Sequence, residues 1–143
     1  MHVVTGGAYN GKLNWVFDHY ELSTKEYTLF SSYRHDLLPD DFETITTDIL
    51  IINGIEGYVK TFLGNEASVA SQTEKIVLDF MNWEQQKDNR KLIVIGNDIS
   101  KGVVPKEAFD REWRDMSGIM YQRLVQSSER FDIVWYGVNR QLK

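Results

Sequence analysis

The stretch His2-Val3-Val4-Thr5-Gly6-Gly7-Ala8-Tyr9-Asn10-Gly11-Lys12-Leu13 decides the fold of this chain. Its first part, His2–Thr5, is predicted to form a short buried strand, and Gly6–Leu13 fits the pattern G-x-x-x-x-G-K of a phosphate-binding loop. In such loops the backbone N–H groups and the lysine hold phosphates, and a Ser or Thr after the lysine holds Mg²⁺. Because Leu13 stands at that last position, the chain keeps the phosphate cradle and lacks the metal-binding hydroxyl.

The segment after the loop favours phosphate binding over the alternative, a tight turn that needs glycine only for its backbone conformation. Leu13, Val16, Phe17 and Tyr20 recur at the spacing of one helix face, so a strand, the loop and a helix follow in the order that phosphate binding requires. Lys12 would contact the terminal phosphates of a nucleotide at the N-terminus of this helix. The predicted nucleotide-binding residues are Gly6, Gly7, Ala8, Tyr9, Asn10, Gly11, Lys12 and Leu13.

The rest of the chain alternates between strand and helix patterns. Further strands are predicted over 26–32, 48–53, 92–95 and 133–136, and the second and third of these are apolar on both faces. Helices are predicted over about 54–87, with a break near Gly64-Asn65, and from Pro105, with a buried face of Phe109, Trp113, Met116, Met120 and Leu124. We therefore predict one α/β domain over residues 1–143, of the P-loop NTPase-like type, with a mostly parallel sheet and helices on both faces.

Composition excludes several classes of function. The formal net charge of −5 and the pI of about 5.2 argue against general binding to nucleic acid or to an anionic membrane. The chain has no cysteine, so it can form no disulfide, thiolate nucleophile or cysteine zinc site. No apolar run reaches the length of a membrane span, and the first predicted strand leaves no room for a signal peptide. The expected location is the cytoplasm.

Three other positions bear on the chemistry of the predicted site. Asn53 ends the 48–53 strand, where P-loop enzymes often place an aspartate that holds Mg²⁺. Asp98 follows the 92–95 strand, and it either faces the phosphate site or belongs to an ordinary glycine-containing loop. The histidines show no metal-ligand spacing, and His35, in a polar loop, is the one placed where chemistry is plausible.

Four segments carry a resemblance to a known family. Residues 94–105 are similar to V-S-N-E-V-G-x-G-I-V-P, and residues 110–122 to A-R-x-F-R-D-x-x-G-x-x-N-Q. Residues 136–143 are similar to A-G-x-P-L-x-L-K, and the glycine loop is similar to G-G-A-R-S-G-K-S. These are patterns of the bifunctional adenosylcobinamide kinase / adenosylcobinamide-phosphate guanylyltransferases of cobalamin synthesis.

The resemblance implies a RecA-type P-loop fold, a homotrimer, and a nucleotide and cobinamide as partners. It also implies phosphorylation of the cobinamide aminopropanol hydroxyl with GTP or ATP, followed by transfer of GMP through a guanylylated histidine. That histidine belongs to a pattern similar to H-R-x-x-R-P-x-x-W-x-T. Alignment on Pro39 places Arg34 at the histidine position, and a one-residue gap restores His35.

The departures from the family pattern leave alternative functions open. Leu13 and Asn53 replace the expected Mg²⁺ ligands, for which Asn14, Glu56 or Asp98 could compensate. In a retained kinase, Lys12 would stabilise the transferred phosphoryl group, Asp98 would assist metal or substrate positioning, and His35 would be the local candidate nucleophile for guanylyl transfer. One alternative is a degenerate nucleotide- or corrinoid-binding protein with a regulatory or scaffolding role. Another is a structural oligomer subunit in which Tyr9 and Leu13 block the loop.

Overall fold

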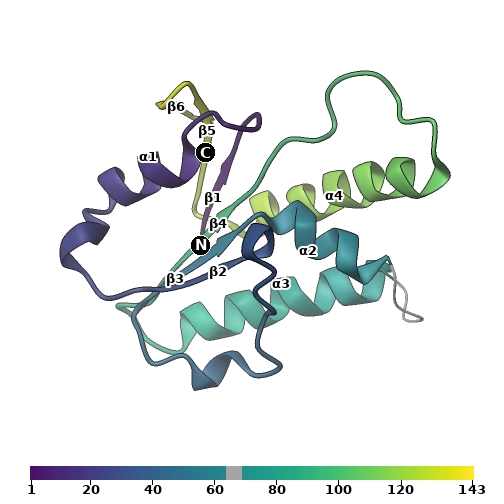
Figure 1. The fold of residues 1–143 in the computed structure, drawn as a ribbon. Helices are drawn as coiled ribbons and strands as arrows, with labels where there is room; N and C mark the ends of the chain where they lie inside the picture. Colours follow the sequence, from purple (N-terminus) through teal and green to yellow (C-terminus); the bar gives the residue numbers. More distant parts are fainter. Residues whose placement is uncertain (64–68) are drawn as a thin grey trace.

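The computed structural model describes residues 1–63 and 69–143. Within these residues the centre is a six-stranded sheet in the order β2-β3-β4-β1-β5-β6 (Figure 1). The parallel strands are β1 (His2–Thr5), β2 (Thr28–Ser31), β3 (Ile49–Asn53), β4 (Lys91–Ile95) and β5 (Arg130–Trp135). The last strand, β6 (Val138–Gln141), runs antiparallel to β5. The predicted α/β fold with a mostly parallel sheet is confirmed.

Helices cover both faces of the sheet, as predicted (Figure 1). The first, α1 (Lys12–His19), lies on one face, and α2 (Ile55–Phe62), α3 (Val69–Gln85) and α4 (Ala108–Ser127) lie on the other. Short 3₁₀ helices occupy Leu22–Thr24, Ser32–Arg34 and Phe42–Thr44. No helix among the described residues is both long and apolar enough to cross a membrane.

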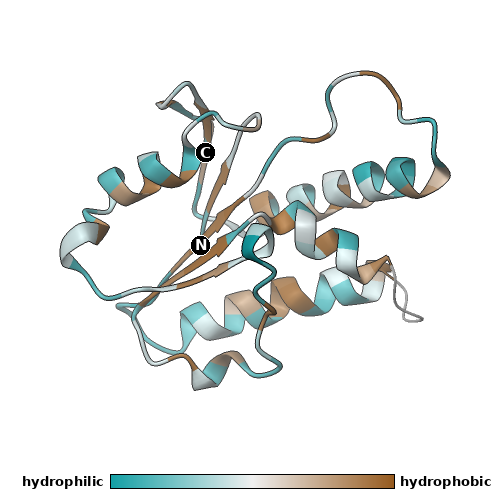
Figure 2. Cartoon of the chain, viewed as in Figure 1, coloured by the Kyte–Doolittle hydropathy of each residue, from teal (hydrophilic) through white to brown (hydrophobic). Residues whose placement is uncertain are grey.

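The two cores follow from the alternation of side chains along each strand. Val4, Ile51 and Ile93 pack in a cluster with Val16 of α1, whereas their neighbours Val3, Ile52 and Leu92 pack with Phe80 and Met120 of the other layer. All of these side chains are fully buried (Figure 2 shows the hydrophobic colouring along the central strands). The strand segments predicted to be apolar on both faces are therefore buried on both faces.

The helix predicted from Pro105 begins later than expected. Glu107 has an extended backbone (φ −76°, ψ 136°), so α4 starts at Ala108. Met120 and Leu124 are fully buried, and Trp113 and Met116 pack partly buried against the core. Phe109, predicted to be buried, is 44% exposed, because the first turn of α4 extends beyond the sheet (Figure 1).

A hairpin at the C-terminal end was not predicted. The expected strand over 133–136 spans Arg130–Trp135, and Tyr136-Gly137 forms a two-residue turn into β6. Both turn residues have positive φ (51° and 80°), as in the type I′ turns that suit the twist of antiparallel hairpins. The predicted helix break at Gly64-Asn65 lies outside the described residues.

Candidate functional site

The glycine loop, Gly6–Leu13, connects β1 to α1 at the carboxyl edge of the sheet. Gly6 has φ +153°, and a Cβ at this position would lie 2.2 Å from the backbone oxygen of Val134 in the neighbouring strand. Any larger residue would push the loop away from β5. The carbonyl oxygen of Gly6 also accepts a 3.0 Å hydrogen bond from Asp98 N, which ties the loop to the segment after β4.

The side chain of Lys12 turns back over the loop. Its Nζ donates hydrogen bonds to the carbonyl oxygen of Gly7 (2.7 Å) and to Oδ1 of Asn97 (2.6 Å). Lys12 is only 7% exposed, and burial lowers its pKa, opposed by the negative charge of Glu56. The ammonium group therefore lies across the loop, where it can meet an anion held by the loop backbone.

Asn97 is held in one orientation by Glu56. Its backbone N–H donates to Oε2 of Glu56 (2.9 Å) and its Nδ2 donates to Oε1 (3.0 Å). Because an ionised carboxylate can only accept hydrogen bonds, the amide NH₂ faces Glu56 and the amide oxygen faces Lys12. Glu56, in the first turn of α2, is 3% exposed.

Tyr33 completes this network from the short helix after β2. Its hydroxyl donates to Oε1 of Glu56 and accepts a 2.7 Å hydrogen bond from Nδ2 of Asn97. Burial, and then the negative charge of Glu56, raise the pKa of Tyr33 well above its usual value. Trp113 of α4 donates a 2.6 Å bond to the backbone carbonyl oxygen of Glu56, so α4 fixes the main chain of this residue while Tyr33 and Asn97 bond its carboxylate.

The network borders a pocket of about 610 Å³ above the glycine loop. This volume lies within the usual range for small-molecule sites. Among the described residues that line it, Lys12 carries the only charge and there is no carboxylate. The lining consists of Ala8, Tyr9, Asn10, Gly11, Lys12, Leu13, Asn14, Tyr33, Asn53 and Asn97. The pocket is thus suited to an anion with an organic part.

The residues at this site do not fit a Mg²⁺ ion. Leu13 provides no hydroxyl, and the amide nitrogen of Asn53 donates a 3.2 Å hydrogen bond to Oγ of Ser31. Mg²⁺ is usually bound by one or two carboxylates together with substrate phosphates. Within residues 1–63 and 69–143, no group of three or more His, Cys, Asp or Glu side chains could hold a metal ion.

Asp98 does not line this pocket. Its carboxylate accepts hydrogen bonds from the backbone and hydroxyl of Ser100 and pairs with Lys101 at 3.5 Å. Burial alone would raise its pKa, but the Ser100 bonds and Lys101 hold it below the usual value. The side chain lines a second pocket of about 370 Å³ between α4 and β5. Asp98 was expected either to face the phosphate site or to belong to an ordinary glycine-containing loop, and its contacts favour the second interpretation.

His35 also lies outside the lining of the glycine-loop pocket. It is exposed, and it has a left-handed backbone (φ 60°) where the short helix Ser32–Arg34 ends. Tyr33, two residues earlier, reaches the pocket instead. Sequence reasoning did not single out Tyr33 or Asn97. The sequence could have indicated Asn97, because it follows the carboxyl end of β4 just as Asn53 ends β3. Ligands bind at this edge of open α/β sheets.

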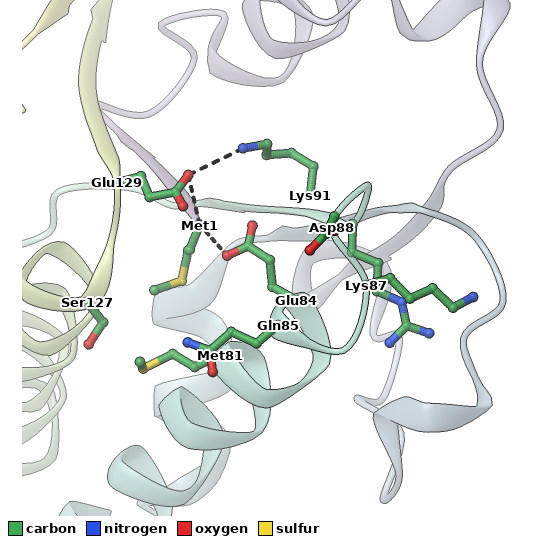
Figure 3. A pocket seen from close by; sticks show the side chains of 10 residues that line it. Met1, Met81, Glu84, Gln85, Lys87, Asp88, Lys91, Ser127 and Glu129 are labelled. Atoms are coloured by element: carbon green, nitrogen blue, oxygen red, sulfur yellow. Dashed lines mark hydrogen bonds and ion pairs between the residues drawn. The ribbon is translucent and has the colours of Figure 1, made fainter.

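A further pocket of about 350 Å³ lies at the amino edge of the sheet (Figure 3). Acidic groups lie beside two of its cations. The amino group of Met1 contacts Glu84, and Lys91 lies 3.5 Å from the carboxylate of Glu129. The glycine-loop pocket, in which a cation lies without an acidic partner in the lining, is the better candidate for an anionic ligand.

The mostly parallel sheet, its two helical layers and the glycine loop between β1 and α1 define a P-loop NTPase-like α/β protein. Residues 16–142 match the model of the cobinamide kinase / cobinamide phosphate guanyltransferase family, and the chain belongs to this family. The match begins after the glycine loop, so it does not test that loop. No curated protein sequence matches the chain.

Proposed function

We propose that this protein binds a purine nucleoside triphosphate, GTP or ATP, through Gly6–Leu13. We further propose that it uses the nucleotide to phosphorylate the aminopropanol hydroxyl of cobinamide in cobalamin biosynthesis. The family supports the role in that biosynthesis. The observation that carries nucleotide binding is the ammonium group of Lys12, which lies over the glycine loop at the floor of a 610 Å³ pocket.

Lys12 would bind the nucleotide by exchanging one of its present acceptors for a phosphate oxygen. Its bonds to Gly7 and Asn97 are to uncharged oxygens, and a hydrogen bond to an ionised group is roughly twice as strong as one between neutral groups. Tyr9 and Leu13 add apolar surface beside the phosphates. During transfer, Lys12 would stabilise the charge on the phosphoryl group.

The guanylyl-transfer half of the family's chemistry has less support in this chain. His35 stays our candidate nucleophile, and its position outside the pocket lining requires the nucleotide to extend beyond the residues around Lys12. A homotrimer and a cytoplasmic location are also proposals, the first from the resemblance alone.

A second candidate function is binding without turnover, in a nucleotide- or corrinoid-binding protein with a regulatory or structural role. The observation that favours it is the joint replacement of both expected Mg²⁺ ligands by Leu13 and Asn53. The loss of one preorganised electrostatic contact can reduce a rate by about 10²–10³-fold. Two such losses would leave binding with little catalysis.

Titration calorimetry with GTP and ATP tests the proposal, followed by an assay for transfer of labelled γ-phosphate to cobinamide. We expect Lys12→Ala to weaken nucleotide binding by about tenfold or more, since it removes a charged hydrogen-bond donor. Lys75→Ala is a matched control, because Lys75 is exposed on α3 and pairs with its helix neighbour Asp79. Equal affinity of the two variants would contradict nucleotide binding at the loop, and binding without transfer would favour the second candidate.

A further inference from the structure

We infer that the glycine-loop site takes its nucleotide as the free polyphosphate anion, with Lys12 rather than Mg²⁺ as the balancing cation. The inference rests on the nucleotide binding proposed above and names the form of the ligand. It concerns the binding step, which a kinase shares with a nucleotide-binding protein that has no turnover.

The first argument is the position that follows the lysine. The loop would offer a metal ion one side-chain ligand, the hydroxyl after Lys12, and Leu13 fills this position with a branched apolar group. The Leu13 side chain packs partly buried against the cluster that contains Val16 and also lines the pocket. Rotation of this side chain cannot provide an oxygen atom, so the position after Lys12 contributes no metal ligand.

The second argument is the engagement of the nearby carboxylates. Glu56 lies closest in the network, but its oxygens already accept hydrogen bonds from the hydroxyl of Tyr33 and from both nitrogens of Asn97. Asp98 bonds Ser100 and lines the other pocket. Neither carboxylate presents an oxygen to the space above the loop, so the compensation by Glu56 or Asp98 that the sequence allows is not built into this arrangement.

The third argument is charge. The described lining of the pocket carries one positive charge, on Lys12, and no negative charge. A nucleoside triphosphate loses two negative charges when it binds Mg²⁺ in solution, so a lining with one cation and no carboxylate attracts the free anion more strongly than the complex. The exposed amide of Asn14 at the start of α1 also lines the pocket and adds no charge to it.

Mg²⁺ linkage tests this inference directly. Titration calorimetry with GTP would be run on the wild-type protein in EDTA and again in excess MgCl₂. We expect the affinity in EDTA to equal or exceed that in MgCl₂. A rise of about threefold or more with Mg²⁺ would overturn the inference and leave the proposed nucleotide binding intact. Absence of binding in both buffers would overturn the proposed function and the inference together.

Two variants locate the cause. Leu13→Ser with Asn53→Asp restores both ligand types, and we expect GTP to bind this double variant about tenfold more tightly with Mg²⁺ than without. Leu13→Ala is the matched control, because it removes the apolar group without adding an oxygen, and its response to Mg²⁺ should equal that of the wild type. A folded double variant without a gain, or a gain in Leu13→Ala, would refute the assignment to these positions, with circular dichroism reporting the folded state.

Discussion

The ammonium group of Lys12 and the side-chain oxygen of Asn97 lie 2.6 Å apart, although 85 positions separate them in the chain. The sheet order explains the contact, because β4 pairs directly with β1 and both strands end at the same edge. Asn97 also donates two hydrogen bonds to the buried carboxylate of Glu56, so it links Glu56 to Lys12. Asn97, in the segment after β4, therefore positions the lysine of the glycine loop, which follows β1.

Substitution of Asn97 by aspartate should destabilise the protein. The new carboxylate would replace the Nδ2 donor that Asn97 offers to Glu56, and two carboxylates placed side by side disfavour each other. We expect a loss of about 1–3 kcal/mol in the free energy of unfolding, measured by urea denaturation at pH 7. Asn82→Asp, at an exposed position on α3, is the control and should change stability little. Equal effects of the two substitutions would show that the Glu56–Asn97 contacts do not contribute.

Tyr33→Phe should weaken the same network without adding charge. The change removes the donor that Tyr33 offers to Glu56 and the acceptor that it offers to Asn97, and it keeps the ring. A lost hydrogen bond from the half-exposed Tyr33 to the buried carboxylate of Glu56 predicts destabilisation by about 1–2 kcal/mol. Denaturant unfolding measures this effect, and Tyr27→Phe is the control because Tyr27 packs edge-on against Phe17 on the opposite layer. Unchanged stability in Tyr33→Phe would mean that water replaces the hydroxyl at no cost.

His2 should make stability fall as the pH is lowered. Burial lowers its pKa from 6.5 to about 4, and its hydrogen bond to Asp132 (2.9 Å) opposes the change. Between these values the unfolded chain binds a proton that the folded protein does not, so stability is full above pH 6.5 and decreases as the pH falls towards 4. The shift corresponds to a loss of up to about 3 kcal/mol. Urea denaturation across this range measures it.

Nuclear magnetic resonance of the imidazole provides the direct check on His2. Its ring should stay neutral to about pH 4 in the folded protein. The pKa of the exposed His19 is also lowered, by burial and then by Arg130, so His19→Gln separates the two contributions. If His2 titrates near its ordinary value, its buried contacts with Tyr20 and Asp132 do not exclude the proton, and the expected slope should vanish.

Much of the fold could be predicted because the central strands are apolar on both faces. Ile51 and Ile93 pack towards α1, and Ile52 and Leu92 pack towards the other layer, so an unbroken aliphatic run between helical segments indicates a buried parallel strand. The final hairpin could not be predicted this way, because Tyr136 is not a residue that usually adopts positive φ.

The part of the candidate site that could be predicted is the part formed by residues adjacent in sequence. The glycine loop lies between strand and helix as expected, and Lys12 reaches back over it. The partners of Lys12 depend instead on which strands are adjacent. Asn97, Glu56 and Tyr33 meet because β4 lies beside β3 and β3 beside β2, an order that local patterns do not contain.

Tyr136→Asn should stabilise the hairpin that joins β5 to β6. Tyr136 is 85% exposed and holds a φ of 51°, which costs a bulky residue more than it costs asparagine. The new Asn-Gly pair is the preferred sequence for such a turn, and we expect a gain of about 0.5–1 kcal/mol in the free energy of unfolding.

Gly137→Ala is the control, and it should have the opposite effect. An added Cβ would meet nothing within 4 Å, so its expected loss of about 1 kcal/mol would come from the φ of 80° alone. Urea denaturation of both variants measures the difference. Destabilisation by Tyr136→Asn would show instead that the Tyr136 ring, through its edge contact with Trp135, contributes more than its backbone conformation costs.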